Sequence, residues 1–122
     1  MLSIIEVLMT NLTETVNASF RFFNLNKLQA YTLEREVSGS SKNQHIRNDN
    51  YDGSVILEND NLEDIFDFFI RQRIDTSECD ILISIAKRID AEITVVPELV
   101  NRMLKFIDCK LTVAHTIARD TK

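Results

Sequence analysis

Histidine and cysteine are the side chains that most often supply a base or a nucleophile near neutral pH, and this chain has only two of each. His45 lies in a polar stretch, whereas His115 alternates with apolar residues near the C-terminus. Cys79 and Cys109 have no histidine close to them in the sequence. An enzyme that uses His115 with a cysteine or an acid would have to assemble them from distant segments. We therefore favour a protein that is not an enzyme.

Metal and phosphate sites need recognisable spacings, and the sequence contains none of them. The histidines, cysteines and acids form no HxxxH, HExxH, CxxC or EF-hand pattern. With only Gly39 and Gly53, the chain cannot form a glycine-rich phosphate loop. The sequence therefore predicts no metal and no cofactor.

Acidic residues instead gather in one short stretch that contains no base. In a helix of 3.6 residues per turn, the apolar stripe Leu62, Ile65, Phe66, Phe69 and Ile70 would face the core, and Phe68 would point outward among the acids. Acids around an exposed aromatic side chain are typical of a protein-binding surface, although a solvated helix start would also favour acids. The predicted partner-binding residues are Glu58, Asp60, Glu63, Asp64, Asp67 and Phe68.

The overall charge restricts the kind of partner. The chain has 19 acids and 14 bases among 122 residues, a net charge of -5 and a pI near 5.0. This balance argues against nucleic acid or an anionic membrane and fits a basic protein. The apolar start from Leu2 to Leu12 lacks a basic segment and is too short to span a bilayer. We expect one domain over residues 1–122, located in the cytoplasm with two reduced thiols.

A second candidate surface is the segment 38–53, which is polar and rich in turn-forming residues. It offers almost nothing to bury, so the sequence predicts an exposed, mobile loop. Tyr51 lies within it, and tyrosine is favoured in interfaces.

Alternating and helical patterns predict the elements that carry these residues. Strands are expected near 16–23, 54–58, 79–89 and 110–118, with a brief one at 93–95. A helix is expected over 27–36, with Leu28 and Tyr31 inward and Leu33 and Val37 as further candidates for the inward face. Two more helices are expected, from an Asp60 N-cap to about residue 71 and from Pro97 to Asp108, and residues 2–12 fit either a helix or a strand. Together they predict an α+β two-layer sandwich, loosely ferredoxin-like, with a mostly antiparallel sheet of four to five strands and helices on one face. The connection 61–78 is long enough to be a crossover.

The C-terminal half carries a resemblance. A strand, a Pro-Glu-Leu helix start at Pro97 and a final strand from Cys109 to Ile117 follow a strand and helix over 54–71. This succession is similar to a group of small uncharacterised bacterial α+β domains and covers roughly residues 16–118.

In size, acidity and single-domain character, the chain also resembles the immunity proteins of bacterial toxin systems, including contact-dependent growth inhibition. The resemblance implies a monomer or homodimer that binds a basic toxin, such as a nuclease, and blocks its active site or substrate surface. The alternative is a small-ligand-binding or regulatory domain that forms a homo-oligomer through a sheet edge or its N-terminal segment. A deep apolar pocket would favour that alternative.

Overall fold

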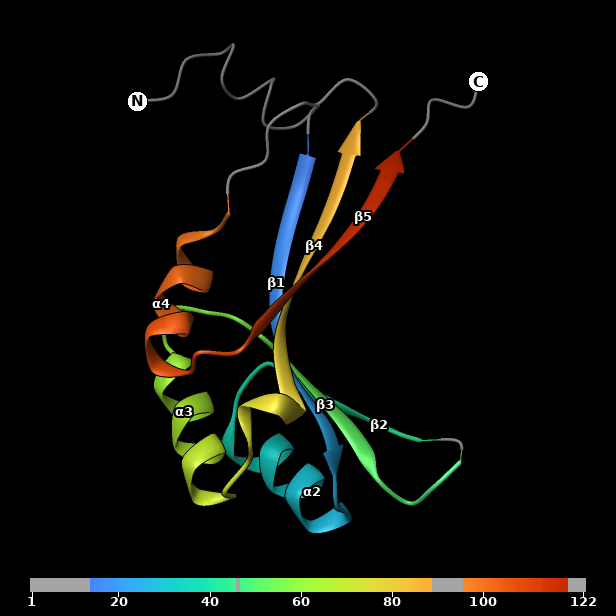
Figure 1. Cartoon of the computed structure of the whole chain (residues 1–122), viewed down its shortest axis with the longest axis vertical. Coiled ribbons are helices and arrows are strands. Elements are labelled where there is room, and N and C mark those ends of the chain that lie inside the picture. Colours follow the sequence, from blue (N-terminus) through green and yellow to red (C-terminus); the bar gives the residue numbers. More distant parts are fainter. Residues whose placement is uncertain (1–13, 46, 89–95, 119–122) are drawn as a thin grey trace.

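The computed structural model describes residues 14–45, 47–88 and 96–118 (Figure 1). The predicted elements over 2–12 and 93–95 lie outside these residues. The elements, in chain order, are β1 (Glu14–Leu25), α2 (Lys27–Glu36), β2 (Ser40–Gln44), β3 (Tyr51–Ile56), α3 (Leu62–Arg71), the 3-10 turn η1 (Thr76–Glu78), β4 (Cys79–Arg88), α4 (Glu98–Phe106) and β5 (Lys110–Ala118).

The five strands form one sheet in the order β2-β3-β1-β4-β5. Three of the strand pairs are antiparallel, and β4 with β5 is parallel. The first four strands have the order and directions of a ferredoxin-like βαββαβ unit, to which α4 and β5 are added. The predicted α+β fold with a mostly antiparallel sheet is confirmed. The parallel pair comes from the connection through α4, since the segment 61–78 joins two strands that are not neighbours.

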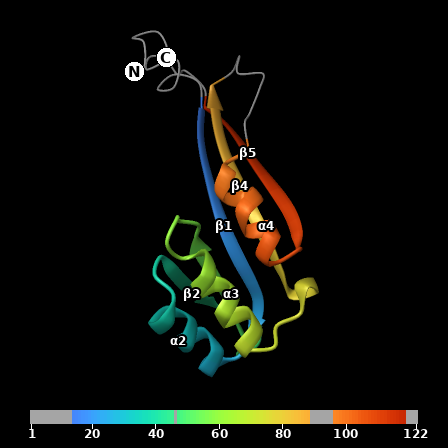
Figure 2. The same ribbon diagram turned by 90° about the vertical axis from the view of Figure 1, so that its left-hand side faces the viewer.

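The core is built on β1, the central strand. Its side chains Ala18, Phe20 and Phe22 are buried, and in the antiparallel register Phe20 lies between Val55 of β3 and Ile81 of β4. Figure 1 draws α3 and α4 to the left of the strands and α2 at the lower end of β1, and Figure 2, seen from that left-hand side, draws the helices in front of the sheet. Phe22 contacts Phe68 of α3 edge-on, with ring centroids 5.1 Å apart, so this face of β1 meets the helices.

Helix α2 has the predicted bounds, and its buried face matches the prediction in part. A capping box starts it: the Asn26 side chain accepts from the Gln29 backbone N–H at 2.8 Å, and the Gln29 side chain accepts from the Asn26 N–H at 2.9 Å. The prediction that Leu28 and Tyr31 face the core is wrong, since their side chains are 73% and 46% exposed. The expectation for Leu33 and Val37 is confirmed, since both side chains are buried, and Ala30 faces the core with them.

The predicted loop 38–53 is wrong, because most of it belongs to a β-hairpin. β2 pairs with β3 from Ser40 opposite Val55 to Gln44 opposite Tyr51. Tyr51 is buried and packs edge-on against Tyr31, so it is not an exposed interface residue. A side chain at Gly53 would place its Cβ 2.5 Å from Leu33 Cδ2, so any larger residue there would force Leu33 of α2 to move.

Strand β5 forms one edge of the described sheet. Leu111 and Val113 lie beside Ile81 and Ile83 of β4 in the parallel register, yet they are 43% and 58% exposed. Within the described residues, no helix is both long and apolar enough to cross a membrane.

Candidate protein-binding surface

The loop before α3 is held by one buried amide. Asn61 is fully buried, and its side chain accepts from the Glu58 backbone N–H at 2.9 Å. The same amide donates to the carbonyls of Ile56 at 2.8 Å and Ser38 at 3.1 Å. These bonds fix the turn from which Glu58 and Asp60 project into solvent. The predicted N-cap of α3 is wrong, because the N-cap is Asn61 and not Asp60. The Asn61 side chain makes no capping hydrogen bond to α3, because it bonds the backbone of the turn and of neighbouring segments.

The five predicted acids all lie on the surface and on one segment of the fold. Glu63 and Asp64 occupy the first turn of α3, where the partial positive charge of the helix N-terminus favours carboxylates. All of them are exposed, and none is in an ion pair with a base of the described chain. We call Glu58, Asp60, Glu63, Asp64 and Asp67 the α3 acidic face.

The predicted outward position of Phe68 is wrong. Its side chain is fully buried, and its ring meets Phe22 of β1 at an interplanar angle of 71°. α3 buries Leu62, Ile65 and Phe68, while Ile70, expected inside, is 53% exposed. The sequence misleads here because apolar residues cover most of the circumference of this helix. Either of two overlapping arcs could face the core.

The aromatic side chain beside the acids comes from α4 instead. Phe106 is 38% exposed, and its ring lies 5.5 Å from that of Phe66 on α3. Only the packing of α4 beside α3 reveals its position, because Phe106 lies far from the acids in the chain.

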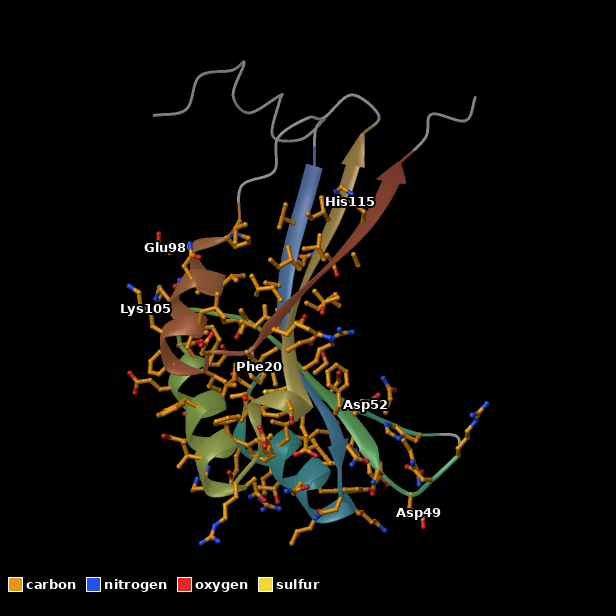
Figure 3. All side chains as sticks on the ribbon, viewed as in Figure 1. Phe20, Asp49, Asp52, Glu98, Lys105 and His115 are labelled. Atoms are coloured by element: carbon orange, nitrogen blue, oxygen red, sulfur yellow. The ribbon has the colours of Figure 1, made fainter. Side chains whose placement is uncertain are left out.

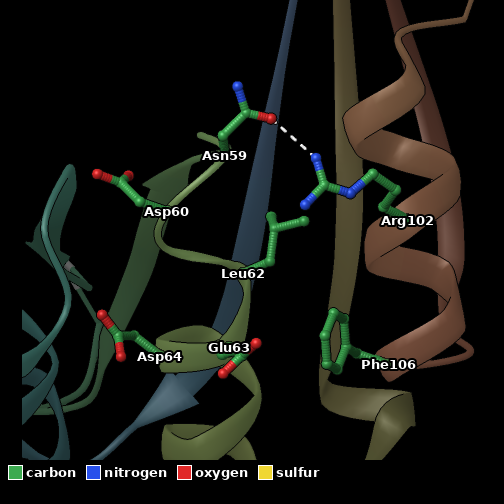
Figure 4. Close-up of a pocket in the computed structure, with 7 residues that line it drawn as sticks. All are labelled: Asn59, Asp60, Leu62, Glu63, Asp64, Arg102 and Phe106. Atoms are coloured by element: carbon green, nitrogen blue, oxygen red, sulfur yellow. Dashed lines mark hydrogen bonds between the residues drawn. The ribbon is translucent and has the colours of Figure 1, made fainter.

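A shallow cleft of about 270 Å³ separates the two helices (Figure 4). One wall carries Asp60, Glu63 and Asp64, and the other carries Arg102 and Phe106. Arg102 Nη1 donates to the Asn59 side-chain oxygen at 2.8 Å across the top of the cleft. Leu62 and Asn59 complete the lining. The cleft therefore combines charge, an aromatic face and a hydrogen bond that links the turn before α3 to α4.

The two histidines lie far apart. Figure 3 labels His115 and also Asp52, whose side chain contacts His45. His45 Nε2 lies 2.7 Å from Asp52 Oδ1 in the hairpin, whereas His115 is an exposed residue of β5. Among the residues that the structure describes, no three His, Cys, Asp or Glu side chains are grouped so as to hold a metal ion.

A further cluster, missed in the sequence, lies on the sheet face opposite α3. Asp80 of β4 accepts two hydrogen bonds from Arg21 of β1, at 2.8 and 2.6 Å, and one from Thr112 of β5 at 2.6 Å. The guanidinium of Arg21 also lies 5.1 Å from the ring centre of Phe23. The three polar side chains bond to one another, so this cluster links the three strands and leaves few free hydrogen-bonding groups for a ligand. The signal that could have found it is a lone acid, Asp80, at the start of a strand of alternating isoleucines.

No protein-family model, curated protein or solved structure matches this chain.

Proposed function

We propose that this protein is an immunity-type binding protein that neutralises a cognate basic toxin, of the nuclease kind, by forming a tight complex. The α3 acidic face would contact the toxin, with Phe106 in place of Phe68 as the aromatic anchor. The protein would act in the cytoplasm, where such a toxin reaches its substrate; the two free cysteines, Cys79 and Cys109, agree with a reducing compartment.

One observation carries the proposal: five exposed carboxylates lie together without an ion pair to any base in the described chain. Like charges placed side by side repel one another, so their gathering contributes little to folding. A basic partner would relieve that repulsion and would be steered towards the face during association.

The face is also held in shape before any partner binds. Asn61 fixes the turn before α3, and the Arg102–Asn59 bond ties that turn to α4. A surface that is already ordered loses less conformational entropy on binding, which favours high affinity. Phe106, half-exposed at the edge of the cleft, supplies apolar area that acids alone lack.

The experiment is a capture from cells that express the native locus, followed by a growth assay. The tagged chain should retain a basic protein that is toxic when expressed alone and harmless when co-expressed with this chain. A retained protein that is harmless alone would contradict the immunity function. If no basic protein is retained, the partner class is wrong.

Charge-matched variants test the surface in the same assay. Asp64→Lys should strongly weaken protection. Asp49→Lys changes the net charge equally at an exposed position in the turn between β2 and β3, which Figure 3 draws on the other side of the sheet from α3, and should leave protection intact. Equal loss in both variants would show that net charge matters and the face does not.

The edge strand β5 favours a second candidate, a regulatory domain that acts as a homo-oligomer. Its exposed Leu111 and Val113 lie beside an edge whose backbone groups could pair with another strand. Light scattering after gel filtration tests this directly: a dimer that Val113→Lys converts to a monomer would support it. The control is Ile56→Lys, at an equally exposed apolar position on β3. A wild-type monomer would exclude it.

A further inference from the structure

Two cysteines far apart in the sequence are brought side by side where β4 and β5 begin. Cys79 is the first residue of β4, and Cys109 directly precedes β5. The parallel register pairs Asp80 with Lys110 and Ile81 with Leu111, so one step back places Cys79 opposite Cys109 on the same face. Neighbouring strands lie about 4.8 Å apart, which is within the range of Cα separations that a disulfide spans.

The two thiols differ in access. Cys79 is 3% exposed, and its Sγ lies 3.6 Å from the Thr76 carbonyl oxygen and 3.8 Å from that of Asp75, to which it can donate. Cys109 is only partly buried, and both cysteines are free. A dissolved reagent therefore reaches Cys109 first.

The thiols also differ in acidity. A hydrogen bond between the two side chains, together with burial, raises the pKa of Cys79 far above that of an ordinary thiol. The same hydrogen bond lowers the pKa of Cys109, against the opposing effects of burial and of the carboxylates of Asp80 and Asp108. Because Cys109 is the more accessible thiol, and because the thiolate is the nucleophile in disulfide exchange, Cys109 is the attacking residue and Cys79 the resolving one.

We propose that Cys79 and Cys109 are a redox-responsive thiol pair, which a small disulfide such as glutathione disulfide converts into an intramolecular disulfide. The Cys109 thiolate attacks one sulfur of glutathione disulfide, and the glutathione thiolate that leaves takes up the proton lost by Cys109. Cys79 then loses its proton and attacks the Cys109 sulfur of the mixed disulfide, which releases a second glutathione thiol. Two protein thiols are oxidised to one disulfide, and one glutathione disulfide is reduced to two thiols.

The bond would join the starts of the parallel strands β4 and β5, and Cys109 directly follows the end of the crossover that carries α4. Arg102 and Phe106 of the candidate surface lie on that crossover. Oxidation would therefore restrain the α4 wall of the cleft, while the α3 acidic face stays unchanged. The redox proposal itself depends only on the two cysteines and holds whether or not a toxin binds.

The test is oxidation of the folded, full-length chain by glutathione disulfide, followed by rapid alkylation and intact mass measurement. We expect a product lighter by two hydrogens that binds no alkylating reagent and yields a peptide with Cys79 linked to Cys109. Cys79→Ser should stop at a stable glutathione adduct on Cys109, and Cys109→Ser should react far more slowly. Circular dichroism checks that both variants are folded.

Three results would overturn the proposal. They are a wild-type chain that stays reduced, a wild-type chain that accumulates the mixed disulfide without resolving it, and equal reaction rates for the two serine variants. In denaturant, where the burial and the hydrogen bond are lost, the variants should react at similar rates. A large difference that persisted there would show that the fold does not cause the asymmetry.

Discussion

Two groups of carboxylates on opposite sides of this protein have opposite surroundings. Asp80 is 1% exposed and accepts three hydrogen bonds, from Arg21 and Thr112 on the neighbouring strands. The α3 acidic face has five exposed carboxylates, none of them in an ion pair with a described base. Asp80 is therefore fully hydrogen-bonded within the fold, whereas the five acids of the α3 acidic face are exposed to solvent.

The difference separates charge that maintains the structure from charge that is available to a partner. Removing Asp80 would leave a half-buried guanidinium without its counter-charge, which is costly. Removing an acid of the α3 acidic face would disturb nothing within the described fold, because exposed charges contribute little. Substitutions of the acids on the two sides should therefore have unequal effects on stability.

The largest effect is expected where α3 meets the sheet. Phe68→Ala should lower the free energy of unfolding by about 4 kcal/mol, because it removes a fully buried ring and leaves a cavity. Phe106→Ala, at a half-exposed position, should cost about 1 kcal/mol or less. Urea unfolding of both variants measures the difference, and similar losses would contradict the assignment of Phe68 to the core and Phe106 to the surface.

Asp80→Asn should have the next largest effect, a loss of about 3 kcal/mol in the free energy of unfolding. The amide cannot neutralise Arg21, and it can no longer accept from both Arg21 and Thr112 with full charge. The matched control is Asp64→Asn on the α3 acidic face, which should stay within about 0.5 kcal/mol of the wild type. If Asp64→Asn were as costly as Asp80→Asn, the comparison would fail.

Protonation of Asp80 at low pH should also destabilise the fold. Burial opposes its ionisation and is the largest single influence, yet the hydrogen bonds from Arg21 and Thr112 and the charge of Arg21 together lower the pKa of Asp80. The folded chain then binds this proton less readily than the unfolded chain. The resulting stability is present above the unfolded pKa, about 3.9, and is lost as the pH falls through the lower folded pKa.

The wild-type chain should therefore lose stability below about pH 4 more steeply than Asp80→Asn, which has no carboxyl to protonate at this position. Thermal unfolding across the acid range measures both slopes. Parallel curves would show that Asp80 is not the acid-sensitive group.

The sequence predicted the strands and helices whose patterns reflect burial on one side. In β1 and β4 the alternation of Phe20 and Ile81 with polar neighbours follows directly from a face that meets helices. The β2–β3 hairpin was missed because β2, Ser40 to Gln44, is a polar edge strand with little to bury. Its place depends on backbone pairing with β3 and on the close approach allowed by Gly53, neither of which leaves a hydrophobic period.

The candidate surface was predictable only where it is contiguous in the chain. The acids from Glu58 to Asp67 are neighbours in the sequence, so they lie close together however the helices are packed. Phe106 and Arg102 join them through the β4–α4–β5 crossover, a tertiary event. The prediction for Phe68 was wrong because the apolar residues of α3 form a wider face than the part of the helix that packs against the core.

The most direct measurement of the central claim is the association rate of the captured toxin with the wild type and with the variant Glu63→Gln, Asp64→Asn, Asp67→Asn, over a range of salt concentrations. If these carboxylates steer a basic partner, the variant should associate at least about tenfold more slowly at low salt, the two rates should converge at high salt, and the stability of the variant should be unchanged. Equal rates at low salt from a folded variant would contradict the claim that the α3 acidic face is the binding surface.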